Sequence, residues 1–116
     1  MRKDFGAKPY LFPQPVLIIG TYNEDGSANA MNAAWGGIAG ADEIIIDLPS
    51  HKTTDNILLK KAFTVSVGDV EHLAACDYVG LVSAKNEPRK MEKAGFHTTP
   101  SKFVDAPVID ELPMTL

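Results

Sequence analysis

One short segment of this chain gathers hydrogen-bond donors and cationic side chains where a helix is expected to begin. Its members that can donate hydrogen bonds or carry positive charge are Ser50, His51, Lys52, Thr53, Thr54 and Asn56. A phosphate needs several donors and some positive potential, and the free N–H groups of a helix N-terminus supply both. The segment therefore predicts a phosphate site, although its threonines could instead serve only as helix caps.

A second segment, residues 29–37, has the composition of a strand that a flat ligand can approach closely. It contains only Ala, Asn and Gly around Met31 and Trp35, where an ordinary core strand carries bulky, branched side chains. Small side chains leave backbone N–H groups accessible, and Gly36 and Gly37 allow close approach of a ligand. A plain strand with a tightly packed neighbour remains the alternative.

A third candidate, residues 90–96, is basic and contains a glycine that suits a helix cap. Four cations within it or just before it could reach an anion held elsewhere: Lys85, Arg89, Lys90 and Lys93. The alternative is a solvated basic helix capped by Gly95. There is no Walker-type or dinucleotide-binding glycine pattern. We expect His72 and His97 to be surface or structural residues, and we assign no catalytic residue and no metal site.

Composition limits the class of protein. We expect residues 1–116 to form one domain. The net charge of −4 argues against a nucleic-acid surface. Cys76 is the only cysteine, so it can form no intrachain disulfide, and we expect a buried, inert thiol. No signal peptide or membrane-spanning stretch is predicted, which indicates a cytoplasmic protein without membrane partners.

The elements that must position these residues are mainly strands with short helices between them. Strands are expected at residues 16–22, 28–38, 43–48 (buried on both faces) and 62–67. Helices are expected at 55–61 (capped by Thr53 or Thr54), at 70–79 (with Leu73 and Ala74 facing inward) and at 89–94. Asp25-Gly26 suits a hairpin turn between the first two strands. The fold class predicted is α+β, mainly β.

The last residues, 113–116, predict the start of a further strand where the chain stops. The open sheet edge that results would tend to pair with another chain. A fragment of a longer domain or an edge covered by another subunit would each explain this ending, and we favour the first.

The three segments, in this order and spacing, resemble the flavin reductase-like FMN-binding split β-barrel family, in particular its flavoredoxin branch. The specific motifs are Asn-x-Met-x-Ala-Ala-Trp from Asn29 and His-x-Thr-x-x-Asn-Ile from His51. The strand at residues 63–67 and the segment 90–96 support the resemblance, which extends from about Val16 to Leu116.

The resemblance implies an antiparallel split barrel that binds FMN non-covalently, usually in a homodimer. It implies a ring site formed by Asn29, Met31, Asn32, Ala33, Ala34 and Trp35. It places the ribityl chain and phosphate near Ser50, His51, Lys52, Thr53, Thr54, Asn56, Ser83 and Lys90. Two positions depart from the family: Ala84 replaces a frequent glycine, and Pro49 removes a backbone donor. Family members continue past Leu116, so the barrel is expected to be incomplete at the C-terminus.

The function implied is that of an FMN-dependent oxidoreductase. NADH or NADPH would reduce FMN, and electrons would pass to free flavin or to a redox partner protein. Two alternatives remain. One is a flavoredoxin-type electron carrier without a nicotinamide site, and the other is a non-redox module that binds another ligand and acts through oligomerisation.

Overall fold

A four-stranded antiparallel sheet forms the centre of the computed structural model, which describes all residues from Met1 to Leu116. The strand order is β2-β1-β5-β8, with bounds Ala28–Ala33, Leu17–Tyr22, Thr64–Val67 and Met114–Thr115. The central strand β1 is buried from Leu17 to Thr21, because it lies between β2 and β5. In contrast, β2 lies at the outside of the sheet and has one edge without a strand partner.

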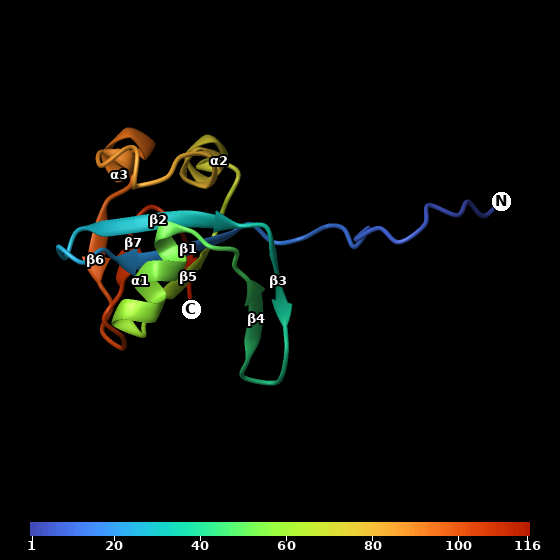
Figure 1. Cartoon of the computed structure of the whole chain (residues 1–116), viewed down its shortest axis with the longest axis horizontal. Coiled ribbons are helices and arrows are strands. Elements are labelled where there is room, and N and C mark those ends of the chain that lie inside the picture. The colour runs from blue at the N-terminus through green and yellow to red at the C-terminus, as the bar shows by residue number, and fades with distance from the viewer.

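Helices cover both faces of this sheet (Figure 1). Helix α1 (Lys52–Lys60) packs on one face, whereas α2 (Leu73–Leu81) and α3 (Lys90–Ala94) pack on the other. Successive side chains of a strand point to opposite faces. Accordingly, Ile18 packs with α2 residues in one core cluster, and Ile19 packs with Ala33 and Val65 in the other. Two small cores therefore hold the helices against one sheet.

The turn between β1 and β2 forms as Asp25-Gly26 predicted. Gly26 has a φ of +85°, and the Asn23 N–H donates to the Ser27 carbonyl at 2.8 Å. The residues after it depart from prediction, because the expected strand 28–38 is two strands. β2 ends at Ala33, and β3 (Trp35–Ile38) leaves the sheet to pair with β4 (Ile44–Asp47).

The expectation that the third strand is buried on both faces is wrong. Ile44 and Ile45 are exposed, and only Ile46 is partly buried. The reason is that β4 has β3 as its only strand partner, in a two-stranded hairpin that projects from the body of the molecule (Figure 1). An apolar run identifies a strand, but it does not say which neighbours will cover that strand.

The first helix begins earlier than predicted and is capped differently. α1 starts at Lys52 with His51 as its N-cap residue, and no side chain accepts a hydrogen bond from the first turn. Thr53 and Thr54 therefore do not cap it. Their hydroxyls are engaged with other groups: Thr53 accepts from Asn29, and Thr54 donates to the Pro49 carbonyl.

The second helix presents a different face to the core from the one predicted. Leu73 and Ala74 are exposed, whereas Cys76 and Val79 are buried. The helix begins about three residues later than expected, so Leu73 and Ala74 lie in its first turn, and the inward face is the one that carries Cys76 and Val79. Cys76 is buried as predicted, and burial raises the pKa of its thiol.

The remaining elements are helical or extended as predicted. α3 ends at Gly95, which has a φ of +76°. A short ladder joins β6 (Thr98–Pro100) to β7 (Pro107–Ile109), within the segment expected to be extended. The strand expected at the C-terminus forms β8, which pairs with β5. The α+β fold class with antiparallel sheets is thus confirmed.

The N-terminal residues extend away from the body of the molecule (Figure 1). No helix or strand precedes β1, and the molecule measures 54 × 31 × 27 Å along its principal axes. Phe5, Tyr10 and Phe12 are exposed on this arm. None of the helices has the length and apolar character needed to cross a membrane.

Candidate functional site

A groove runs along the open edge of β2, and we refer to it as the β2 groove. It consists of two adjoining clefts that share Met31 and His51. The first, of about 120 Å³, lies between β2, the start of α1 and the connection from α2 to α3. The second, of about 300 Å³, continues along β2 to Trp35 and Asp47. The edge position of β2 thus gives one ligand access to both predicted segments.

The first cleft contains a buried acceptor without a partner. The Asn29 Nδ2 atom donates to the Thr53 hydroxyl at 2.9 Å, and both residues are almost fully buried. The Asn29 Oδ1 atom has no hydrogen-bond partner. Such a buried acceptor typically destabilises a fold by about 1–3 kcal/mol. A ligand hydroxyl in the cleft would supply the missing donor.

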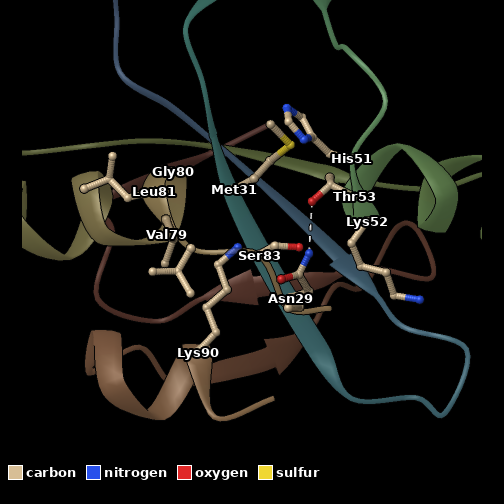
Figure 2. Close-up of a pocket in the computed structure, with 12 residues that line it drawn as sticks. Asn29, Met31, His51, Lys52, Thr53, Val79, Gly80, Leu81, Ser83 and Lys90 are labelled. Atoms are coloured by element: carbon tan, nitrogen blue, oxygen red, sulfur yellow. Dashed lines mark hydrogen bonds between the residues drawn. The ribbon is translucent and has the colours of Figure 1, made fainter. Parts of the chain in front are cut away.

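The same cleft contains a buried cation without a counter-charge. Lys90 is 4% exposed and forms no ion pair with a carboxylate. Burial lowers the pKa of Lys90 to about 8, because the charged form loses its hydration. Figure 2 shows its side chain running from α3 toward Ser83. An anion placed here would offset the loss of hydration.

The other three cations expected to reach an anion are paired with carboxylates instead. Lys85 lies 3.1 Å from Asp55, and Arg89 lies 2.5 Å from Glu92. Lys93 pairs with Glu87. Lys90 is therefore the member of this basic cluster whose charge remains available to a ligand.

Hydroxyl groups complete the polar end of the groove. Ser83 lines the first cleft from the α2–α3 connection, and its hydroxyl accepts from the Lys85 N–H at 3.2 Å. That hydroxyl can still donate to an anion. Lys52 also lines this cleft, and its side chain extends away from Lys90 on the other side of Asn29 (Figure 2).

The opposite end of the groove is apolar and open. Met31, Ala34 and Trp35 line the second cleft, and the Trp35 side chain is 60% exposed. Ala33 lines it too, although its side chain belongs to a core cluster with Leu17 and Ile19. Asn32 contributes to the cleft, but its amide donates to the Cys76 carbonyl at 3.2 Å.

Three residues predicted at the phosphate lie outside both clefts: Ser50, Thr54 and Asn56. The buried Asn56 amide donates to the Thr21 hydroxyl at 3.0 Å and to Asn23 Oδ1 at 2.8 Å. These bonds hold α1 against the β1–β2 turn. Asn56 therefore positions the helix that carries Thr53.

Helix α2 contributes a wall of the first cleft that the sequence motifs did not predict. The residues 79–82 line the first cleft, together with Ala84. A signal for this wall was present, because Gly80 falls within an apolar helical stretch. A Cβ on Gly80 would lie 2.8 Å from the Asn32 Cβ, so the glycine permits close packing of α2 on β2.

The sequence pattern of the flavin reductase like domain matches residues 10–116. The chain belongs to this family. The family resemblance predicted from the two motifs is therefore confirmed.

Solved structures of this flavin reductase-like family share the fold. Flavoredoxin of Desulfovibrio vulgaris (Miyazaki F) is 35% identical, with a TM-score of 0.93 over 99% of this chain. Flavoredoxin from Methanosarcina acetivorans is 25% identical, with a TM-score of 0.79 over 99%. The 2-nitrobenzoate 2-nitroreductase of Pseudomonas fluorescens is 24% identical, with a TM-score of 0.79 over 91%.

The flavin reductase-like chain is shorter than these neighbours. It spans 64% of the Desulfovibrio flavoredoxin chain, 62% of the Methanosarcina flavoredoxin and 53% of the nitroreductase. Among curated proteins, no sequence matches it significantly.

Proposed function

We propose that the chain binds FMN non-covalently in the β2 groove. One observation carries this proposal: the same cleft contains a buried cation without a counter-charge, Lys90, and a buried acceptor without a partner, Asn29 Oδ1. One group that places an anion near Lys90 and a hydroxyl near Asn29 would satisfy both. The phosphate and ribityl chain of FMN carry these two groups in sequence, and the family membership supports a flavin.

At the polar end, Lys90 supplies charge to the phosphate, and Ser83 and Thr53 supply hydroxyls. Asn29 accepts a hydrogen bond from the ribityl chain through Oδ1. His51 and Met31 lie where the two clefts join, so they contact the middle of the ligand. Lys52 adds positive potential at the rim of the groove.

At the apolar end, the ring lies over the segment from Met31 to Trp35. Flat ligands stack on apolar and aromatic surfaces, and Trp35 offers both. The backbone N–H groups on the free edge of β2 can donate to polar atoms of the ring. A second copy of the chain that packs beside Trp35 would exclude water from this end, so we include a homodimer in the proposal.

The proposed activity is that of a flavin reductase-like oxidoreductase. When bound, FMN would accept a hydride from NADH or NADPH and supply electrons to free flavin or a redox partner. The role of the chain is to bind and orient the cofactor, and no side chain acts as acid or base. A second candidate, an FMN electron carrier without a nicotinamide site, is favoured by the 35% identity to a flavoredoxin.

The first experiment is a visible absorption spectrum of the purified protein, followed by titration with FMN and riboflavin. We expect flavin absorption bands and tighter binding of FMN than of riboflavin, because only FMN carries the phosphate. Equal affinities for FMN and riboflavin would show that Lys90 does not bind the phosphate. Rapid bleaching by NADH or NADPH supports the reductase, whereas reduction only by a partner protein supports the electron carrier.

Two neighbouring threonines give a matched pair of variants. Thr53→Val should weaken FMN binding by about 1–3 kcal/mol, because it removes a buried hydroxyl that lines the cleft. Thr54→Val removes a hydroxyl bonded to Pro49 outside the cleft, so FMN affinity should not change. Equal effects of the two substitutions would argue against the assigned position of the phosphate.

A further inference from the structure

The backbone of Glu87 contacts both groove residues that the α2–α3 connection contributes. Its N–H donates to the Ser83 carbonyl at 3.0 Å, and its carbonyl accepts from the Lys90 N–H at 3.2 Å. Glu87 is thus the one residue bonded to the main chain of both Ser83 and Lys90. The spacing between those two residues depends on where Glu87 is held.

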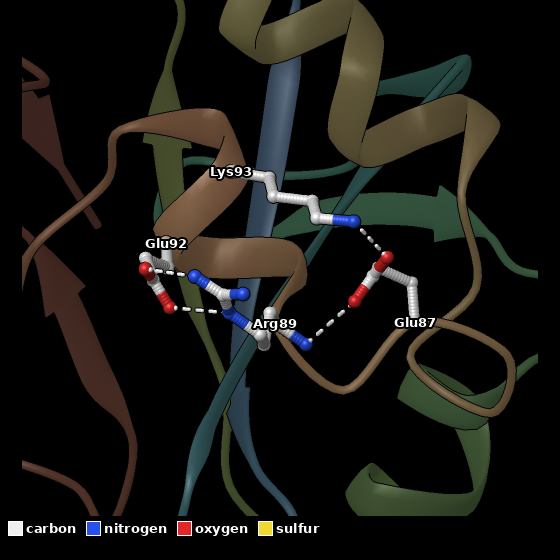
Figure 3. A network of polar contacts seen from close by, with 4 residues as sticks. All are labelled: Glu87, Arg89, Glu92 and Lys93. Atoms are coloured by element: carbon white, nitrogen blue, oxygen red, sulfur yellow. Dashed lines mark hydrogen bonds and ion pairs between the residues drawn. The ribbon is translucent and has the colours of Figure 1, made fainter.

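The side chain of Glu87 attaches this residue to both ends of α3 (Figure 3). Oε1 accepts from the Arg89 N–H at 3.0 Å, next to the first helical residue, and Oε2 accepts from the Lys93 ammonium in the last turn. These two bonds lower the pKa of Glu87, so its carboxylate is ionised at neutral pH. A helix as short as α3 has little stability of its own, and such anchors determine its position.

A second ion pair on the same helix lacks these connections. Arg89 and Glu92 are three residues apart, and their side chains are each 66% exposed. Neither side chain bonds to Ser83 or Lys90. Both ion pairs reach the surface and contribute little to the free energy of unfolding. They differ in what they connect, which makes Glu92 a control for Glu87.

We infer that Glu87 is a positioning residue, which sets the separation of Ser83 and Lys90 so that both reach one phosphate. The inference rests on the proposed FMN site. It assigns to an acidic residue a supporting role in anion binding. Supporting contacts of this kind are known to affect metal affinity by roughly 10–100-fold.

When Glu87 is removed, an electrostatic role and a positioning role predict opposite changes in FMN affinity. Removing a carboxylate near the groove raises the local positive potential and releases Lys93, so Coulomb attraction alone would strengthen FMN binding. Loss of positioning would weaken it. The direction of the change therefore separates the two effects.

The test measures dissociation constants for FMN and riboflavin with Glu87→Ala, Glu87→Gln, Glu92→Gln and the unmodified chain. The readout is the preference for FMN over riboflavin, since loss of fold lowers both affinities. We expect Glu87→Ala to reduce this preference roughly tenfold. Glu87→Gln keeps one acceptor oxygen, which can serve the Arg89 N–H or the Lys93 ammonium but not both, so we expect a smaller loss than in Glu87→Ala. Glu92→Gln should leave the preference unchanged.

Several outcomes would overturn the inference. These are an unchanged or increased preference in Glu87→Ala, an equal loss in Glu92→Gln, and a loss in Glu87→Gln as large as in Glu87→Ala. A Lys90→Met variant separates this failure from failure of the proposed function. If Lys90→Met keeps the full preference for FMN, the phosphate site itself is wrong. If Lys90→Met loses the preference and Glu87→Ala does not, only the role of Glu87 is wrong.

Discussion

Lys90 is the residue in which burial and charge conflict most strongly. Its side chain lines a cleft that also holds hydroxyl and amide side chains, and it forms no ion pair with a carboxylate. Burial lowers the pKa of Lys90 to about 8, because the charged form loses more hydration in the cleft than the neutral form does. In the proposed site, a bound phosphate would reverse the preference, since it would pair with the charged form. The proposal therefore links binding to protonation of Lys90.

This linkage predicts a pH dependence of FMN affinity. Above pH 8 the free protein loses the Lys90 proton, so binding must recover it, and FMN affinity should fall roughly tenfold between pH 7 and pH 9. The second ionisation of a phosphate monoester is near pH 6, so the ligand keeps its charge throughout. Isothermal titration calorimetry at several pH values measures the FMN dissociation constant, and hence its slope against pH.

Two controls belong to this measurement. Riboflavin affinity should not follow the same curve, because riboflavin has no phosphate. Lys90→Met should remove the pH dependence of FMN binding over this range. If FMN affinity still fell with pH in Lys90→Met, the titrating group would be a residue other than Lys90.

At the scale of elements, the site depends on how tightly β1 is enclosed. Gly20 lies in β1 where β5 and β7 approach it, and an added Cβ would lie 2.5 Å from the Thr64 hydroxyl and 2.7 Å from the Pro107 carbonyl. The Thr64 hydroxyl itself donates to that carbonyl at 2.5 Å. A side chain at position 20 would push β5 and β7 away from β1, the strand that pairs with β2.

We therefore predict that Gly20→Ala destabilises the fold. The free energy of unfolding, measured by urea denaturation, should fall by about 1–3 kcal/mol or more, the usual effect of overpacking against backbone. Gly37→Ala is the matched control in a strand, because nothing lies within 4 Å of its added Cβ. Similar losses in the two variants would show that the loss of glycine flexibility, and not enclosure, determines the result.

At the scale of the whole molecule, two features project from the body and expose apolar side chains (Figure 1). One is the N-terminal arm with Tyr10, Leu11 and Phe12, and the other is the β3–β4 hairpin with Trp35 and Ile45. They approach each other, because Leu11, Phe12 and Trp35 line a common cleft beside the apolar end of the β2 groove. A continuous apolar surface of this kind is typical of protein–protein contact.

The proposed homodimer predicts that this surface is buried between two copies. Phe12→Ser should raise the dimer dissociation constant by at least about tenfold, since each buried aromatic side chain contributes about 1.5–3 kcal/mol. Lys8→Ser, an exposed change on the same arm, should have no such effect. Sedimentation equilibrium measures both. A chain that is monomeric at all concentrations would contradict the homodimer.

Local patterns in the sequence predicted much of the fold. The Asp25-Gly26 turn, the start of a strand near residue 16 and the glycine cap at Gly95 depend on backbone conformation within a few residues, so short-range rules suffice. The same holds for the motifs that identify the family. Strand ends, the inward face of α2 and the exposure of β4 were not predicted, because they depend on which distant elements pack nearby.

The sequence determined that the site would combine small residues, hydroxyls and cations, because residue types and their order fix that chemistry. Only the tertiary structure decided which members share one groove. It places Thr53 inside and Thr54 outside, although the two are adjacent in the chain. It also pairs Lys93 with Glu87 and leaves Lys90 without a counter-charge. Burial and pairing are properties of long-range contacts, which no local pattern specifies.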